Sequence, residues 1–196
     1  MEEQKQYPIL PWRLWSEMPL NARIGCCIVL VLALVIVTIF NFRVDVSIFE
    51  VISGYVTVLF LLWLGVIDAM YKRLPNKILL AWLVIRLLLI MPGAAFIGTE
   101  VLISSFAAAA TMFIFFLLAY FMSKRTLGGG DVKLGFVLGL ALTFNLIFIA
   151  VFLALVFSAA FGLAGMFLKK MTRKDMIPLG PFFFAGTLAA YLLALL

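Results

Sequence analysis

Long apolar runs separated by short polar segments make up most of the chain. A helix needs about 20 consecutive apolar residues to cross the hydrocarbon core of a bilayer. The run from 132 to 168 is too long for one helix, and the segment 143–145 offers a place to turn. The pattern therefore predicts an all-α, polytopic membrane bundle of six to seven helices, at residues 24–40, 51–71, 78–97, 101–122, 132–143, 146–168 and 181–196.

The basic residues collect in alternate connections between these helices. Lys and Arg are concentrated in the first 23 residues and at 72–77, 124–133 and 169–174, whereas the other connections hold acids and a single base, Arg43. Cytoplasmic loops of membrane proteins carry an excess of Lys and Arg. We therefore expect a multi-pass protein of the cytoplasmic membrane, with its N-terminus and these basic segments on the cytoplasmic side.

The beginning of the chain differs from the rest. Residues 1–23 combine prolines, tryptophans and charges, which predicts an interfacial arm with Trp anchors. The run 24–40 resembles a signal peptide, but no small-residue cleavage site follows it, which favours a retained helix. We divide the chain into the arm 1–23, an extra N-terminal helix with its outer loop at 24–50, and a six-helix core at 51–196.

The composition of the chain excludes a soluble fold and several kinds of catalytic site. Of the 196 residues, 66% are hydrophobic and 12% charged, against about 45–50% and 25% in soluble domains, so a soluble fold is excluded. The chain has no histidine, which excludes His-based triads and most zinc sites. Its two cysteines, Cys26 and Cys27, are adjacent and cannot form a disulfide framework. Any catalysis must therefore come from the few carboxylates.

Two aspartates are placed unlike the other acids. Asp68 and Asp131 lie in or directly against apolar segments, at the ends predicted to be cytoplasmic. An ionisable group at membrane depth is costly and indicates a functional site. Two lone aspartates at the same depth suggest a pair.

A structural explanation is open for each aspartate. Asp131 follows three glycines, Gly128, Gly129 and Gly130, which allow unusual backbone angles or a close approach of another chain. The segment is also compatible with a plain turn in which Asp131 is the N-cap of the next helix. Asp68 is four residues before Lys72, so an ion pair on the helix surface is the alternative to a functional role.

A pair of carboxylates is sufficient for hydrolysis of a peptide bond. When two carboxylates are close together in a low-dielectric site, one keeps a proton near neutral pH. The ionised partner acts as a base on water, and the protonated partner polarises the carbonyl. This chemistry needs no metal, no cofactor and no histidine.

Three motifs resemble one family in the same order. GGGD, ending at Asp131, resembles the GxGD motif of membrane aspartyl proteases, and the following VKL resembles the type IV prepilin peptidase version. DAMYKRLPN, beginning at Asp68, resembles that family's other aspartate motif, with Leu74 in place of Ile. IPLGPF, residues 177–182, resembles its closing motif.

The resemblance implies cleavage of the leader peptides of prepilin-like or pseudopilin-like membrane precursors, as in type IV pilus assembly, near the cytoplasmic face. It carries over Asp68 and Asp131 as the catalytic pair. The motifs also contribute candidate residues of the substrate loop or site, which are Gly128, Gly129, Gly130, Lys133, Pro75, Asn76, Pro178, Gly180 and Pro181.

The chain departs from many family members in one respect. No connection is long enough for the cysteine-bearing insertion that is linked to N-methylation, so we expect the short form, a peptidase without methyltransferase activity. The basic loops fit anionic lipid head groups and give no reason to invoke nucleic acid. The alternative from another class is a non-enzymatic transporter or assembly subunit whose aspartate pair binds an ion.

Two cations within the apolar segments need a separate explanation. Lys133 lies two positions after Asp131, about 200° around a helix, so we expect it to face away from the carboxylate and to reach lipid phosphate. Arg86 lies deep in the helix 78–97, and we expect it to pair with an aspartate or with carbonyl groups inside the bundle.

Overall fold

The computed structural model describes residues 15–16, 18–43, 47–123, 127–142, 144–168 and 177–195. Within these residues the chain is helical, without strands, which confirms the predicted fold class. Most of the proposed arm 1–23, and the basic connections at 124–126 and 169–176, lie outside the described residues. The helices are α2 (Leu20–Arg43), α3 (Ile48–Tyr71), α4 (Asn76–Ile97), α5 (Glu100–Met122), α6 (Gly129–Ala141), α7 (Phe144–Phe167) and α8 (Gly180–Leu193).

Each helix coincides closely with a predicted one. The largest shifts at a helix start within the core are three residues, at α3, which begins at Ile48 instead of residue 51, and at α6, which begins at Gly129 instead of residue 132. The interruption predicted at 143–145 is present, because α6 ends at Ala141 and α7 begins at Phe144. Among the described residues, α2, α3, α4, α5 and α7 are long and apolar enough to cross a membrane, whereas α6 and α8 are shorter.

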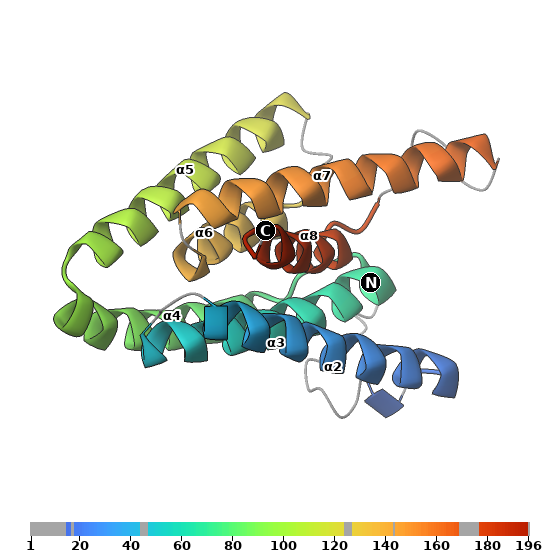
Figure 1. Ribbon diagram of the computed structural model, residues 1–196. Coiled ribbons are helices and arrows are strands. Elements are labelled where there is room, and N and C mark those ends of the chain that lie inside the picture. Colours follow the sequence, from blue (N-terminus) through green and yellow to red (C-terminus); the bar gives the residue numbers. More distant parts are fainter. Residues whose placement is uncertain are drawn as a thin grey trace.

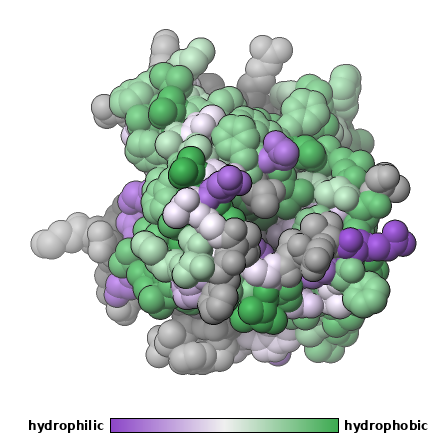
Figure 2. Space-filling model, turned by 60° about the vertical axis from the view of Figure 1, so that its left-hand side comes forward, coloured by the Kyte–Doolittle hydropathy of each residue, from purple (hydrophilic) through white to green (hydrophobic). Residues whose placement is uncertain are grey.

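The two short helices occupy the middle of the bundle. Figure 1 shows α2, α3 and α4 together on the lower side, α5 and α7 across the top, and α6 and α8 between them. Helix α6 is buried along most of its length, and α8 packs against both α3 and α7. The outer helices instead expose many large apolar side chains, and the face in Figure 2 is mostly hydrophobic, as expected of a surface that contacts lipid.

Glycine allows the central helices to approach their neighbours closely. A Cβ atom at Gly139 of α6 would lie only 2.6 Å from the Cα atom of Ala109 on α5. At Gly186 of α8 the added atom would collide with the Ala150 carbonyl of α7. Small residues at helix crossings are typical of membrane bundles, where packing and not water exclusion holds helices together. These crossings fix α6 and α8 inside the bundle.

Arg86 joins three helices deep in the bundle. Its side chain is 2% exposed, and its Nε atom donates a hydrogen bond of 2.6 Å to the carbonyl oxygen of Leu140, in the last turn of α6. Its Nη1 atom donates to Ser53 Oγ at 2.8 Å, and its Nη2 atom forms an ion pair with Glu50 Oε1 at 3.2 Å. Pairing inside the bundle is therefore confirmed, with a carbonyl group as expected, but the acidic partner is a glutamate from the first turn of α3 and not an aspartate.

Candidate active site

Asp68 lies in the last turn of α3, where the chain turns into α4. The helix ends because Lys72 adopts a left-handed conformation, with φ of 52°, and donates its backbone N–H to the Asp68 carbonyl oxygen at 2.8 Å. Pro75 then disfavours a helical conformation at Leu74 and serves as the N-cap of α4. The Asp68 side chain is 6% exposed. The turn 72–75 thus holds a nearly buried carboxylate at the end of a spanning helix.

The first residue of α8 binds the Asp68 carboxylate. The backbone N–H of Gly180 donates a hydrogen bond of 2.7 Å to Asp68 Oδ2. The N–H groups of a first helical turn have no partner within their own helix, and this end of a helix favours negative charge. A Cβ atom at Gly180 would lie 2.9 Å from Asp68 Cβ, so glycine is required for this approach. Pro181 follows directly and contacts α3 at Gly65, whose added Cβ would lie 3.3 Å from the Pro181 backbone.

Asp131 occupies the third position of α6. The interpretation of Asp131 as an N-cap is wrong: Gly128 is the N-cap residue, and α6 begins three residues earlier than predicted. Asp131 Oδ2 instead accepts a hydrogen bond of 3.2 Å from the backbone N–H of Gly128, which orients the carboxylate back toward the start of its own helix. Negative charge is favourable in this first turn.

The glycines before Asp131 have different environments. A Cβ atom at Gly130 would lie 2.9 Å from Leu74 Cβ, so Gly130 allows the first turn of α6 to pack on the turn that follows Asp68. At Gly128 the nearest atom to such a Cβ is Asp131 Oδ2, at 3.1 Å, whereas at Gly129 nothing lies within 4 Å. Gly130 is therefore the glycine that brings the two aspartate segments together.

One cavity contains both aspartates. Its volume is about 380 Å³. Its lining residues are Asp68, Lys72, Arg73, Leu74, Asn76, Gly128, Gly129, Gly130, Asp131 and Lys133. Asp131 lies outside the five helices long enough to cross a membrane, and burial, followed by the charge of Asp68, raises its pKa to about 7. A buried carboxyl group close to a second carboxylate is expected to keep its proton near neutral pH.

The structure places the remaining candidate residues in different ways. Within the described part of the chain, the Lys72 ammonium makes no ion pair with Asp68, so the alternative explanation of Asp68 as half of a surface pair is wrong. Pro75 caps α4, and Pro178 is half-buried in the segment before α8; neither lines the cavity. Gly65 was missed, although a glycine one helical turn before Asp68 is a signal of close packing on that face.

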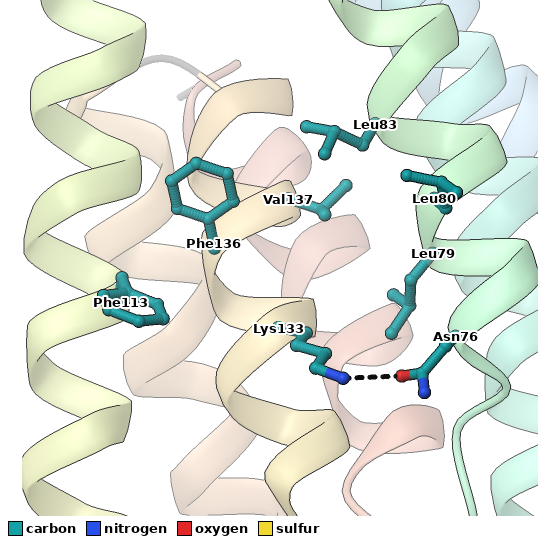
Figure 3. A pocket seen from close by; sticks show the side chains of 8 residues that line it. All are labelled: Asn76, Leu79, Leu80, Leu83, Phe113, Lys133, Phe136 and Val137. Atoms are coloured by element: carbon teal, nitrogen blue, oxygen red, sulfur yellow. Dashed lines mark hydrogen bonds between the residues drawn. The ribbon is translucent and has the colours of Figure 1, made fainter.

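Lys133 does not face away from Asp131. Its side chain lines the same cavity, and its Nζ atom donates a hydrogen bond of 2.9 Å to Asn76 Oδ1 at the start of α4 (Figure 3). The angle of about 200° between positions 131 and 133 directs their Cα–Cβ bonds toward different sides of the helix. A lysine side chain is nevertheless long enough to reach around the helix. Lys133 and Asn76, two candidates from separate motifs, are thus in direct contact.

The fold and this cavity define a polytopic helical membrane protein with a paired-carboxylate site. The chain belongs to the type IV leader peptidase family, whose family model matches residues 55–163, a range that includes both aspartates. It is 26% identical over 150 residues to a Prepilin leader peptidase/N-methyltransferase of Bacillus subtilis (strain 168). That match covers 73% of this chain and 56% of the relative, so the chain spans little more than half of the relative's length. No solved structure matches the chain.

Proposed function

We propose that this chain is a membrane aspartyl endopeptidase that removes the leader peptide of type IV prepilin-like precursors at the cytoplasmic membrane face. The observation that carries the proposal is the single cavity lined by Asp68 and Asp131. Membership of the type IV leader peptidase family and the named activity of the Bacillus subtilis relative support a precursor protein as the substrate. The basic residues Lys72, Arg73 and Lys133 lie beside the aspartates, which supports the cytoplasmic side.

The two carboxylates have different surroundings, which suggests their roles. Each carboxylate accepts a backbone N–H, Asp68 from Gly180 at 2.7 Å and Asp131 from Gly128 at 3.2 Å. The shorter bond gives the ionised form of Asp68 the stronger stabilisation, so we assign Asp68 as the base. Asp131, with a pKa raised to about 7, holds the proton and is the acid. Asp68 removes a proton from water as the water oxygen attacks the scissile carbonyl carbon, and Asp131 donates its proton to the carbonyl oxygen.

The second half of the reaction restores both groups. When the tetrahedral intermediate collapses, the carbon–nitrogen bond breaks, and Asp68 gives its proton to the leaving amine. Asp131 recovers its proton from the hydroxyl group that becomes the carbonyl of the new carboxyl terminus. The enzyme therefore ends in its starting protonation state without a metal or a covalent intermediate.

Co-expression with a prepilin-like precursor tests the proposal. In membranes from cells that make the precursor, we expect Asp68→Asn and Asp131→Asn each to abolish leader removal, scored as a mass shift of the precursor. Glu100→Gln is the matched control, because Glu100 is an exposed acid in the first turn of α5 and lies outside the cavity. Full processing by either aspartate variant contradicts the proposed mechanism.

The same experiment examines methylation. Because the sequence has no connection with a cysteine-bearing insertion, we propose that this protein does not methylate the new N-terminus of the cleaved product. Mass spectrometry of the mature product, in a host without another such enzyme, distinguishes a free amine from one carrying an added methyl group. An added methyl group that depends on this chain contradicts the proposal.

A further inference from the structure

A second cavity lies beside the catalytic one, between α4 and α6. Its volume is about 350 Å³, and apart from two polar residues its lining is apolar. The lining residues are Asn76, Leu79, Leu80, Leu83, Phe113, Lys133, Phe136 and Val137. Figure 3 shows Leu79, Leu83 and Val137 pointing into the space between the two helices, with the polar pair at one end. We call this cavity the α4–α6 groove.

The groove is continuous with the catalytic cavity. Asn76 and Lys133 line both, and the hydrogen bond of 2.9 Å between them marks the boundary. From Asn76 the groove follows one face of α4 as far as Leu83. Seven residues of helix rise about 10 Å, so the groove reaches about a third of the way through a hydrocarbon core of about 30 Å.

The groove opens sideways, toward lipid. Leu80 on one wall is 60% exposed and Phe113 on the other is 39% exposed. A chain that enters from this side must satisfy its own backbone hydrogen bonds, because lipid supplies none, so it must be helical. The groove therefore suits an apolar helix that is already in the membrane.

We infer that the α4–α6 groove binds the apolar transmembrane helix of the substrate itself, an inference that rests on the proposed peptidase function. The groove ends at the catalytic cavity, so a helix seated there presents its N-terminal end next to Asp68 and Asp131. The first N–H groups of a helix lack partners within the helix. Asn76 Oδ1, which now accepts from Lys133, is an acceptor for such groups at the point where the substrate must unwind.

Filling the groove tests this assignment. Leu80→Trp places a large ring at the groove, and Leu88→Trp is the matched control, because Leu88 is on the same helix, is 68% exposed and does not line the groove. The full-length protein in proteoliposomes is given two synthetic precursors with the same leader and cleavage site. One precursor carries a complete apolar helix, and the other ends a few residues after the cleavage site.

The expected result is selective. Leu80→Trp raises the KM for the helix-bearing precursor about tenfold, which corresponds to about 1.4 kcal/mol, and leaves its kcat and the kinetics of the truncated precursor unchanged. Leu88→Trp changes neither KM nor kcat for either precursor. Equal effects of Leu80→Trp on both precursors, or an effect on neither, overturn the inference. If the wild-type protein cleaves neither precursor, the proposed function itself fails, and the inference fails with it.

A crosslink provides a readout that does not depend on the kinetics of the tryptophan variant. A photoreactive benzoylphenylalanine is introduced in place of Leu80 or Leu88 in the inactive Asp131→Asn protein, so that bound precursor is not cleaved. We expect the helix-bearing precursor to crosslink at position 80 and not at position 88. Crosslinking to lipid alone at position 80 contradicts the inference.

Discussion

The carboxylate of Asp68 and the backbone N–H of Gly180 form a hydrogen bond of 2.7 Å although 112 positions separate them in the sequence. The bond joins the end of α3 to the beginning of α8, and the missing Cβ of Gly180 makes room for it. The IPLGPF segment therefore supplies a hydrogen-bond donor to a nearly buried carboxylate. A hydrogen bond to a charged group contributes about 1.5–3 kcal/mol.

Gly180→Ala is therefore expected to reduce activity strongly. The added methyl group would lie 2.9 Å from Asp68 Cβ and 3.1 Å from Oδ2, so α8 or the Asp68 side chain must move. Loss of one such charged hydrogen bond predicts a fall in kcat of about tenfold or more. Gly25→Ala is the matched control, since nothing lies within 4 Å of its added Cβ on α2. Unchanged leader removal by Gly180→Ala contradicts the role assigned to the bond.

The pH dependence of activity follows from the proton on Asp131. Its pKa is raised to about 7, so the protonated form predominates below that pH and is lost as pH rises through it. An enzyme that needs this proton loses activity in the same direction, and at pH 8 about a tenth of the molecules retain it. Measurements of kcat/KM from pH 6 to 9, in one lipid and at constant ionic strength, check the expectation. A constant or rising kcat/KM over this range shows that Asp131 is not the acid.

Contact between Gly130 and Leu74 predicts a compensating pair of substitutions. Gly130→Ala places a methyl group 2.9 Å from Leu74 Cβ and pushes the first turn of α6, with Asp131, away from the turn after Asp68. We expect lower activity, and we expect partial recovery when Leu74→Gly removes the opposing atom. Rates of leader removal by the two single variants and the double variant check this. If the double variant is no more active than Gly130→Ala, another contact limits the approach of the two segments.

Substitution of Arg86 is expected to lower the thermal stability of the protein more than its catalytic rate. Arg86→Met leaves Glu50 with a charge that has lost its partner, and it leaves the Leu140 carbonyl without its donor. Removing one partner of a fully buried ion pair costs about 3–5 kcal/mol, and the cost here is expected to be smaller because the Glu50 side chain is 21% exposed. The double variant Arg86→Met with Glu50→Gln is expected to unfold at a higher temperature than Arg86→Met alone, because no unpaired charge remains. Thermal unfolding in detergent measures both, and equal unfolding temperatures contradict the prediction.

Helix positions were predictable from the sequence because membrane helices require long apolar runs, and α3, α4 and α5 begin within a few residues of their predicted starts. The start of α6 also differs by three residues, and here the glycines are the reason. A run of three glycines reads as a turn, but Gly129 and Gly130 are the first residues of the helix, with Gly128 as its cap. Packing against Leu74 and the interior position of α6 stabilise a helical start that glycine alone disfavours.

Pairing between distant residues could not be predicted from a single sequence. The apolar surroundings of Arg86 predict that it needs partners, but not that Glu50, Ser53 and Leu140 supply them. Lys133 shows a similar limit, because the angle between helix positions describes where a side chain starts and not where a flexible chain ends. The aspartates themselves were identifiable because so few charged residues occur within the apolar segments.

Helix α6 has 13 residues and ends inside the bundle, where Arg86 of α4 donates a hydrogen bond to its last turn. A helix of that length rises about 20 Å, which is less than the hydrocarbon core of about 30 Å, so α6 does not span the membrane by itself. Spanning helices tilt or shift when the bilayer becomes thicker or thinner, at a cost of a fraction of a kcal/mol per Å. Because contacts within the protein set the position of α6, we expect the rate of leader removal to depend only weakly on the acyl-chain length of the surrounding lipid.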